Sequence, residues 1–548
     1  MINSDLDRPD HCIRIVRGQE AANLLRDSCF QEEWDALADA CPWATACQSY
    51  NYISTWFEIY SNCFEPLFVL HETGEGRLAG LLALAISSDG KSLVHAGACQ
   101  AEYQVWLARP SSSDTFILGA LSILREQFPG KYIRLQYVPD RTPMSWISHA
   151  RTRGVSTKRT VVKRPLLETV TESQINASLR KKSNRSRINR LKKIAELKFT
   201  RISKRQDLEP FIGSIADFCD LRQGAINRTF PFRDDPHKKE FWLGLLEKTG
   251  LIHASALMLG DAPIAVHIGP ISRSSVSLGI ICHSPFFSEH SPGKLLILYL
   301  AKQLAQENFS YFDLTAGGDE YKSRFASRFD EASILEISFD GFDYYLGVMR
   351  HGLLGSAKHM LGPVATSRAK ALRRRFSLSA NLFHLASSKK KIIYHSRDTP
   401  PLPPISVPTV SLRVNCLSDL LLPKVRYSRR EMECEFLAEA LRLLEAGARM
   451  YTYANRGILL HCSWVASDRS APPGMMRGRG QAWHFWETYN VTEALAPNVR
   501  VLSLSQRLHD AKQFASSQDV FVHLERRDDG AARFLEQYGF IHVDRANG

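Results

Sequence analysis

Residues 276–325 read VSLGIICHSPFFSEHSPGKLLILYLAKQLAQENFSYFDLTAGGDEYKSRF, and this stretch decides the fold. Its first eight residues are mostly apolar and rich in β-branched side chains, which predicts a strand over residues 276–283. A turn cluster at 291–293 precedes an apolar pattern over residues 294–307 that is too long for a strand and fits a helix. Residues 311–314 form a second short strand. The order strand, loop, helix, strand predicts an α/β unit, with functional groups on the loops at its strand ends.

The loop before this helix is a candidate anion site. A helix N-terminus presents unpaired backbone N–H groups and partial positive charge, and a turn of small residues lets a phosphate approach them. Ser291, Pro292, Gly293, Lys294 and Leu295 form this candidate pyrophosphate-binding segment. An ordinary turn capped by Gly293 is the alternative, because short glycine motifs recur by chance.

The whole stretch resembles the acyltransferase family, within the GNAT superfamily of N-acyltransferases, that is associated with bacterial cellulose and other polysaccharide synthesis. The residues that carry the resemblance are the SPGKLL run at 291–296, Asp313, and the GGDEYK run at 317–322. A weaker resemblance extends over about residues 34–339. It implies two GNAT-like halves, as in the related Fem-type aminoacyl transferases. It also implies an acyl-CoA lying across the parted central strands, with its pyrophosphate on residues 291–294.

Acyl transfer to an amine needs an oriented nucleophile, a base to take its proton, and a donor near the carbonyl oxygen. Asp313 is the first candidate for the base or amine anchor, and orienting the following turn is its alternative role. Lys322 is a candidate to stabilise developing negative charge, or pairs with a surface acid instead. Tyr321 is a candidate proton donor or a packed aromatic. His283, at the end of the first strand, is a candidate base or a structural histidine.

Bulk properties limit the class of protein. The 548 residues suffice for three or four domains, and 44% hydrophobic with 23% charged residues is typical of globular proteins. The net charge of +13 favours anionic partners, such as a nucleotide cofactor, RNA or an anionic membrane surface. The eleven cysteines are scattered and no Cys/His cluster suggests zinc, so no metal is expected. Without a recognisable signal peptide, and with its purest apolar run at 78–86 too short to span a bilayer, the chain is predicted to be cytoplasmic.

Four segments are predicted along the chain. Residues 1–165 form an N-terminal GNAT-like half, a structural twin or substrate wall, and residues 166–345 form the second half with the acyl-CoA site. The second half begins with a basic segment at 179–193, which indicates a surface helix or a phosphate-binding or RNA-binding one. Residues 346–408 form a basic and proline-rich connector, which either packs on the second half or contacts an anionic membrane. The predicted fold class is α/β (α+β), with tandem GNAT-like folds whose mixed, mostly antiparallel central sheets are flanked by helices.

Residues 409–548 are predicted to be a third, degenerate GNAT-like domain. Ala494-Leu495-Ala496-Pro497 stands where a glycine-rich pyrophosphate loop belongs, and a proline has no N–H to offer a phosphate. Leu535 stands where GNAT proteins usually have a tyrosine. This unit is therefore expected not to be catalytic.

The sequence favours an acyltransferase that uses acetyl-CoA or another acyl-CoA. Its acceptor would be a small molecule, an amine or a sugar or lipid precursor, and the resemblance implies a role in polysaccharide biosynthesis. Two alternatives stay open. One is an aminoacyl-tRNA-dependent transferase of the Fem type, although nucleic acid is not the favoured partner. The other is a non-catalytic adaptor for a membrane-bound polysaccharide synthase.

Overall fold

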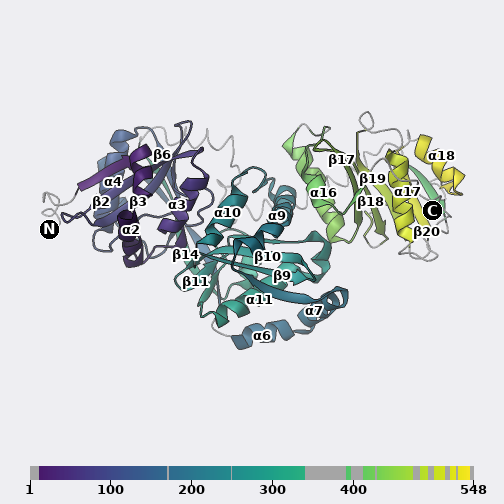
Figure 1. Cartoon of the computed structure of the whole chain (residues 1–548), viewed down its shortest axis with the longest axis horizontal. Coiled ribbons are helices and arrows are strands. Elements are labelled where there is room, and N and C mark those ends of the chain that lie inside the picture. Colours follow the sequence, from purple (N-terminus) through teal and green to yellow (C-terminus); the bar gives the residue numbers. More distant parts are fainter. Residues whose placement is uncertain are drawn as a thin grey trace.

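The computed structural model describes residues 12–169, 172–248, 250–339, 391–396, 412–425, 427, 429–468, 470–472, 475, 482–491, 499–512, 519–525 and 529–543. Three units follow one another along the chain, with the second between the first and the third (Figure 1). Each unit contains a sheet flanked by helices, and the strand pairings are mostly antiparallel. This confirms the predicted fold class of mixed, mostly antiparallel central sheets flanked by helices.

The first unit starts at the N-terminal end of the described chain. Its elements are β1 (Cys12–Arg17), α1 (Gly18–Leu24), α2 (Ser28–Ala40), η1 (Ala46–Gln48), α3 (Tyr50–Ile59), β2 (Phe64–Glu72), β3 (Leu78–Ser87), β4 (Leu93–His95), β5 (Leu107–Ala108), α4 (Ser113–Gln127), β6 (Tyr132–Pro139), α5 (Ile147–Ala150), η2 (Arg151–Arg153) and β7 (Ser156–Glu168). Helix α2 begins where Asp27 accepts a hydrogen bond from Cys29 N, and Phe30, Trp34 and Leu37 form its buried stripe. The strands β1-β2-β3-β4, with β5 beside β3, make an antiparallel sheet under these helices.

The second unit contains the stretch that decided the fold. Its elements are α6 (Glu172–Arg180), α7 (Lys182–Ile194), β8 (Leu197–Ile202), α8 (Arg205–Leu208), η3 (Glu209–Phe211), α9 (Ile212–Asn227), α10 (Lys238–Glu247), β9 (Ile252–Leu259), β10 (Ala262–Ser272), β11 (Ser275–Ser277), β12 (Ile280–His283), η4 (Pro285–His290), α11 (Pro292–Gln306), β13 (Tyr311–Asp313), α12 (Glu320–Phe325) and β14 (Arg328–Ser338). The predicted basic segment is helical but broken, because Lys181 is non-helical and separates α6 from α7. Helix α11 buries the face that carries Leu296, Leu300 and Leu304 against the sheet.

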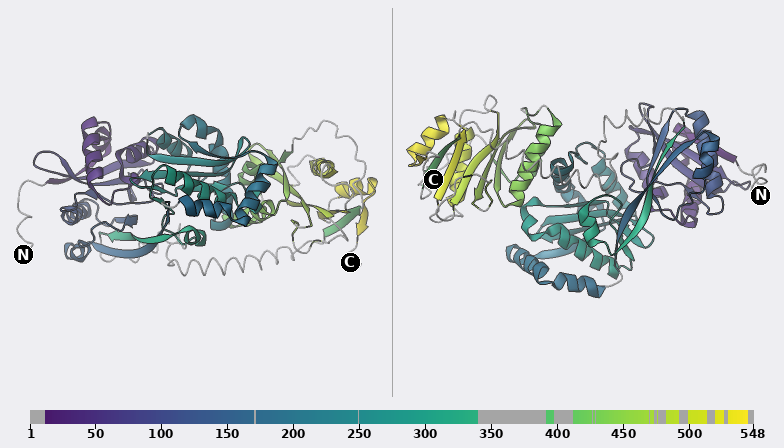
Figure 2. Two further views of the ribbon diagram at one scale, coloured as in Figure 1. Left: turned by 90° about the horizontal axis from the view of Figure 1, so that it is seen from below. Right: turned by 180° about the vertical axis from the view of Figure 1, so that it is seen from behind.

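The two predicted halves share one sheet. Its order is β6-β14-β7-β13-β11-β10-β9-β8, with β12 beside β10. The last strand of the second unit, β14, therefore lies between two strands of the first, β6 and β7 (Figure 2). The predicted boundary at residue 165 falls inside β7 and does not separate two sheets. Local sequence does not reveal that β14 pairs with strands of the first unit, because the partners of a strand depend on tertiary packing.

The third unit has its own sheet, in the order β16-β17-β18-β19-β20-β15-β21. Its elements are β15 (Lys391–Ser396), β16 (Arg413–Val414), α15 (Leu417–Leu421), α16 (Arg430–Glu445), β17 (Arg449–Asn455), β18 (Ile458–Ser467), β19 (Ala482–Asn490), α17 (Val499–Lys512), β20 (Asp519–Glu525), α18 (Asp529–Gln537) and β21 (Ile541–Val543). Strand β15 lies in the predicted connector but pairs with β20 and β21, so the third sheet begins before residue 409. The apolar run at Ile392, Ile393 and Tyr394 explains this strand. The rest of the connector, 346–390 and 397–408, lies outside the described residues.

The second and third units are joined by a continuous apolar core. Ile215 and Leu221 of α9 belong to the same buried cluster as Phe436, Leu437 and Leu441 of α16. Helix α16 lies between the two units (Figure 1) and contacts both α9 and η4. The third unit is therefore packed against the second, beside the loop that precedes α11.

The described residues were also compared with the requirements of a membrane-spanning helix and of a metal site. Within the described ranges, no helix combines the length and the apolar character needed to cross a bilayer. Over the same part of the chain, no group of three or more His, Cys, Asp or Glu side chains is arranged to hold a metal ion.

Candidate active site

Strands β11 and β13 lie parallel but pair over only three positions, ending at Ser277 and Asp313. The chain then bulges at Gly279, and among the described residues β12 pairs with β10 and not with β13. Gly279 has φ +47°, and a Cβ there would lie 2.3 Å from the carbonyl oxygen of Ile268, so the bulge requires glycine. The single strand predicted over residues 276–283 is therefore interrupted, and β12 and β13 separate where Asp313 ends its strand.

The predicted pyrophosphate-binding segment forms the start of α11. Ser291 precedes the helix with φ +51° and makes no side-chain cap, and Pro292 is the first helical residue. Leu295 donates its N–H to Ser291 O over 3.2 Å, and its fully buried side chain belongs to the core. The N–H groups of Gly293 and Lys294 have no intrahelical acceptor by helix geometry. These two amides, at the positive end of the helix dipole, are the groups that an anion would meet.

Four basic side chains gather around this turn, and we call them the basic rim: Lys181, Arg187, Arg190 and Lys294. Burial lowers the pKa of Lys294, and the charges of Arg187 and Lys181 lower it further. Burial also lowers the pKa of His290 in η4. The charge of Glu289 opposes this decrease, and those of Arg190 and Arg187 add to it. None of the four rim side chains forms a salt bridge with a residue that the structure describes. Such a cluster of like charges favours an anionic ligand.

His283 ends β12 and lies against the first turn of α11, where a Cβ on Gly293 would be 3.0 Å from Nδ1. Its Nε2 is 2.8 Å from a terminal nitrogen of Arg222. Because a guanidinium only donates, Nε2 accepts and the proton of the neutral ring is on Nδ1. Burial, and then the charge of Arg222, lower the pKa of His283 to about 3. The ring's lone pair is already used, which does not fit the predicted role as a base.

Asp313 is fully buried and each of its carboxylate oxygens is hydrogen-bonded. Oδ2 accepts from the Tyr103 hydroxyl at 2.7 Å and from Nε and a terminal nitrogen of Arg164 at 3.0 and 2.6 Å. Oδ1 accepts from Thr315 N at 2.8 Å. The carboxylate therefore orients the turn that follows β13 and fixes it to the first unit. This arrangement fits the alternative role of Asp313 and leaves no free oxygen for proton abstraction.

Asp313→Asn should lower the free energy of unfolding by about 1–3 kcal/mol, because Arg164 and Tyr103 would lose a charged acceptor in a buried site. Urea or thermal unfolding measures this. The matched control is Asp330→Asn, which removes the partly exposed ion pair with Arg328 and should stay within about 0.5 kcal/mol of the parent. Equal stability of the two variants would contradict the structural role of Asp313.

A chain of three polar side chains lies beside Asp313. Lys322 is only 6% exposed, and its Nζ donates to Thr315 Oγ1 over 3.0 Å. The Thr315 side chain also interacts with the carboxylate of Glu102, which comes from the first unit, and lowers its pKa. Burial of Lys322 excludes the exposed surface ion pair that was its alternative role. The arrangement links a buried cation to a carboxylate through one threonine.

The environment of Glu102 is suited to proton transfer. Burial raises its pKa, and the charge of Lys322 opposes this increase. Thr315 connects the two groups from a left-handed conformation with φ +59°, which is rare for a β-branched residue. Such strain persists only where surrounding contacts impose it, and it clusters at functional sites. A carboxyl group with a raised pKa is a candidate general base.

Two tyrosines border this cluster. Tyr321 is 36% exposed, and burial followed by the charges of Asp319 and Glu102 raises its pKa, so it remains protonated. Tyr137 has φ +51°, and burial raises its pKa to about 12. Its hydroxyl lies 4.0 Å from where a Cβ on Gly317 would be. Tyr321 is the more exposed of the two tyrosines, and its role as a proton donor stays a prediction.

The predicted residues therefore divide into two groups. Asp313, Lys322 and Tyr321 lie together at the exit of β13, and His283 lies with residues 291–295 at the start of α11. The first group is completed by residues that the sequence analysis missed, all from the first unit: Glu102, Tyr103, Tyr137 and Arg164. The sequence holds only a weak signal for one of these four residues: Glu102 is the one acidic residue between positions 89 and 114.

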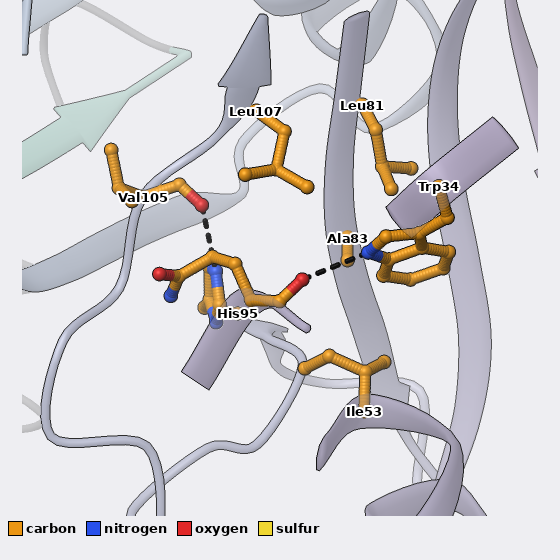
Figure 3. A pocket seen from close by; sticks show the side chains of 8 residues that line it. Trp34, Ile53, Leu81, Ala83, His95, Val105 and Leu107 are labelled. Carbon is orange, nitrogen blue, oxygen red and sulfur yellow. Dashed lines mark hydrogen bonds between the residues drawn. The ribbon is translucent and has the colours of Figure 1, made fainter. Parts of the chain in front are cut away.

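A small hollow in the first unit is separate from this site. It is lined by Trp34, Gln48, Ile53, Leu81, Ala83, His95, Val105 and Leu107 (Figure 3). His95 Nε2 lies 3.1 Å from Val105 O, and Trp34 donates to Gln48 O over 2.8 Å. Burial lowers the pKa of His95 to about 4, so its ring is neutral. The walls are mostly apolar, which is typical of a core packing gap.

A family model matches the part of the chain that contains this geometry. Residues 178–323 match the model of an acetyltransferase (GNAT) domain. The match includes α7, the loop before α11, α11 itself and the turn from Asp313 to Lys322. The chain thus carries a GNAT-type acetyltransferase domain, and its class is that of an acyltransferase.

Solved structures similar to the chain are distant in sequence. FemX has 9% identity and a TM-score of 0.40, over 56% of this chain and 95% of its own. L-PGS from Bacillus licheniformis has 9% identity and a TM-score of 0.37, over 59% and 95%. A GCN5-related N-acetyltransferase from Anabaena variabilis has 9% identity and a TM-score of 0.26, over 59% and 72%. No curated protein matches this sequence.

Proposed function

We propose that the chain is an acyl-CoA-dependent N-acyltransferase, which moves an acyl group directly from acetyl-CoA or a longer acyl-CoA to an amine or to a sugar or lipid precursor. The observation that carries the proposal is the basic rim around the open first turn of α11, whose side chains form no salt bridge with a described residue. The donor's phosphates would meet the amides of Gly293 and Lys294, flanked by Arg187. Its acyl group would extend between β12 and β13 toward the cluster at Glu102.

Direct transfer forms a bond from the acceptor nitrogen to the acyl carbon and breaks the carbon–sulfur bond. Glu102 takes the proton from the attacking amine, and Lys322, acting through Thr315, stabilises the ionised carboxylate before the attack. Tyr321 gives a proton to the departing thiolate, because its raised pKa keeps it protonated until that charge develops. Asp313 acts indirectly by fixing the backbone of Thr315. Positioning of the two substrates supplies the rest of the rate enhancement.

Calorimetric titration with acetyl-CoA and longer acyl-CoAs tests the proposal. We expect micromolar binding that weakens as salt is added, because exposed charges are screened. Arg187→Gln should weaken binding about fivefold, as expected for one partly exposed ion pair. The control, Lys193→Gln, removes a charge at the last turn of α7, away from Lys294, and should bind like the parent. Absence of binding to every acyl-CoA would overturn the proposal.

Transfer from aminoacyl-tRNA is the second candidate. The observation that favours it is the exposed basic surface of α7, where Arg185, Arg190, Lys192 and Lys193 are all exposed. In that case a nucleic-acid backbone would neutralise many of these charges, and affinity would fall steeply with the logarithm of salt concentration. Charged tRNA that competes with acyl-CoA for the protein would favour this candidate.

A role in cellulose or other polysaccharide synthesis rests on the resemblance of residues 291–296 and 317–322 to that family. Contact with a membrane-bound synthase or an anionic membrane surface would follow from it. A purely non-catalytic adaptor is the third candidate, and it predicts no acyl transfer to any acceptor. The raised pKa of Glu102 and the strained Thr315 favour an enzyme, because an adaptor has no use for either.

The third unit is proposed not to bind a donor. Its strands β19 and β20 pair in parallel and part after Phe485, as β11 and β13 do. Near the start of α17, however, Glu487 is nearly buried and bonds to Arg500 over 2.7 Å. Arg500 is thus already paired with a carboxylate, which makes it less available to a phosphate. The loop at 494–497, which suggested degeneracy, lies outside the described residues.

A further inference from the structure

The loop that precedes α11 is in contact with the third unit. We call residues 284–291, which include η4, the donor loop. Helix α16 of the third unit ends at Glu445, against η4 and α9. Glu445 Oε1 accepts a hydrogen bond from a terminal nitrogen of Arg222 over 2.5 Å and lies 3.5 Å from Ser288 Oγ of the donor loop. One carboxylate of the third unit therefore contacts both the donor loop and the arginine behind it.

The same nitrogen of Arg222 also reaches the first turn of α11. It donates to His283 Nε2 over 2.8 Å, and His283 Nδ1 lies beside Gly293. Glu445 is thus connected to the proposed phosphate site by two contacts, first with Arg222 and then with His283. Neither Arg222 nor Glu445 belongs to the strands or loops that carry Glu102 and Lys322.

The charges show why the carboxylate matters. His283 is neutral, so it does not compensate the charge of Arg222, and the neighbouring end of α11 is positive. Glu445 is the partner that neutralises Arg222. The Glu445 side chain is 34% exposed and the Arg222 side chain 28%. Without it, Arg222 would lose its anchor, and the orientation of the His283 ring, set by the bond to Nε2, would be lost with it. Ser288 would also lose its contact with the third unit.

We propose that Glu445 makes the third unit a positioning part of the donor site, holding the donor loop and the His283 ring in the geometry that receives an acyl-CoA. This inference rests on the proposed function for the site of donor binding. The third unit then acts as a support for catalysis by the second, although we propose that it binds no donor itself. It differs from a tethered adaptor, whose removal would leave the donor site unchanged.

The experiment compares Glu445→Ala and Glu445→Gln with the control Arg430→Ala in the full chain. Arg430 forms an exposed ion pair with Asp234 across the same interface, away from the donor loop. We expect Glu445→Ala to raise the KM for acyl-CoA about 3–10-fold with little change in kcat, as for loss of a partly exposed charged hydrogen bond. Glu445→Gln keeps the acceptor oxygen and should recover part of the affinity. Arg430→Ala should leave the KM unchanged.

Hydrogen–deuterium exchange supplies a readout that needs no substrate. Glu445→Ala should speed exchange in residues 284–295, and Arg430→Ala should not. Equal exchange in both variants, or an equal change in KM, would overturn the positioning role of Glu445. If the parent protein binds no acyl-CoA, the proposed function fails, and exchange in residues 284–295 still decides whether Glu445 holds the loop.

Discussion

Glu102→Gln should lower kcat by about 10²–10⁴-fold, the usual contribution of a positioned general base. Glutamine has nearly the same shape and keeps an acceptor oxygen beside Thr315, but it does not take a proton from the acceptor amine. The measurement is thiol release from the acyl-CoA, with an acceptor found by screening amines. The KM for the donor should change little, because Glu102 lies outside the basic rim.

The pH profile separates a base from a structural carboxylate. Burial raises the pKa of Glu102, and a base acts only when ionised, so kcat/KM of the parent should rise with pH through a pKa above that of an ordinary glutamate. This rising limb should disappear in Glu102→Gln. The control is Glu168→Gln, an exposed carboxylate at the end of β7, which should keep the rate and the profile of the parent. An unchanged rate in Glu102→Gln would contradict the mechanism.

Gly293→Asp should weaken acyl-CoA binding by about 100-fold or more. The substitution places a carboxylate in the first turn of α11, where the donor's pyrophosphate is proposed to bind, and like charges in contact cost several kcal/mol. Calorimetric titration measures the loss, and thermal unfolding verifies that the variant is folded.

The matched control for this variant is Gly293→Asn, which has the same shape without the charge. Any Cβ at this position would lie 3.0 Å from His283 Nδ1, so both variants share the steric effect. We expect Gly293→Asn to lose much less affinity than Gly293→Asp. Equal losses would show that crowding of His283, and not repulsion of phosphate, accounts for the effect, and would place the pyrophosphate elsewhere.

Prediction from the sequence worked where the determinants are local. The apolar pattern of residues 294–307 predicted α11 to within two residues at its start and one at its end. It failed for the strand over residues 276–283, because the bulge at Gly279 depends on the approach of Ile268 from β10. It also failed for β15, whose six residues gain their strand partners only from β20 and β21.

For the candidate site too, features that depend on local sequence could be predicted, and features that depend on tertiary contacts could not. The proposed donor segment at 291–295 and the candidates Asp313, Tyr321 and Lys322 could be named from the sequence, because they lie close together along one stretch. The chemical roles of these residues did not follow from the sequence, because a role depends on tertiary contacts. Asp313 is ion-paired with Arg164, which favours its structural role, and the base that we propose is Glu102, from another unit of the chain.

Helix α11, its open first turn and the basic composition of α7 follow from local sequence, since periodicity, capping and charge act over a few residues. Which distant groups meet depends on the folded chain. Tyr103 and Asp313 are 210 positions apart, and Arg222 and Glu445 are 223 apart. Such contacts are set by strand register and by the packing of helices in a continuous core, and no local pattern encodes either of them.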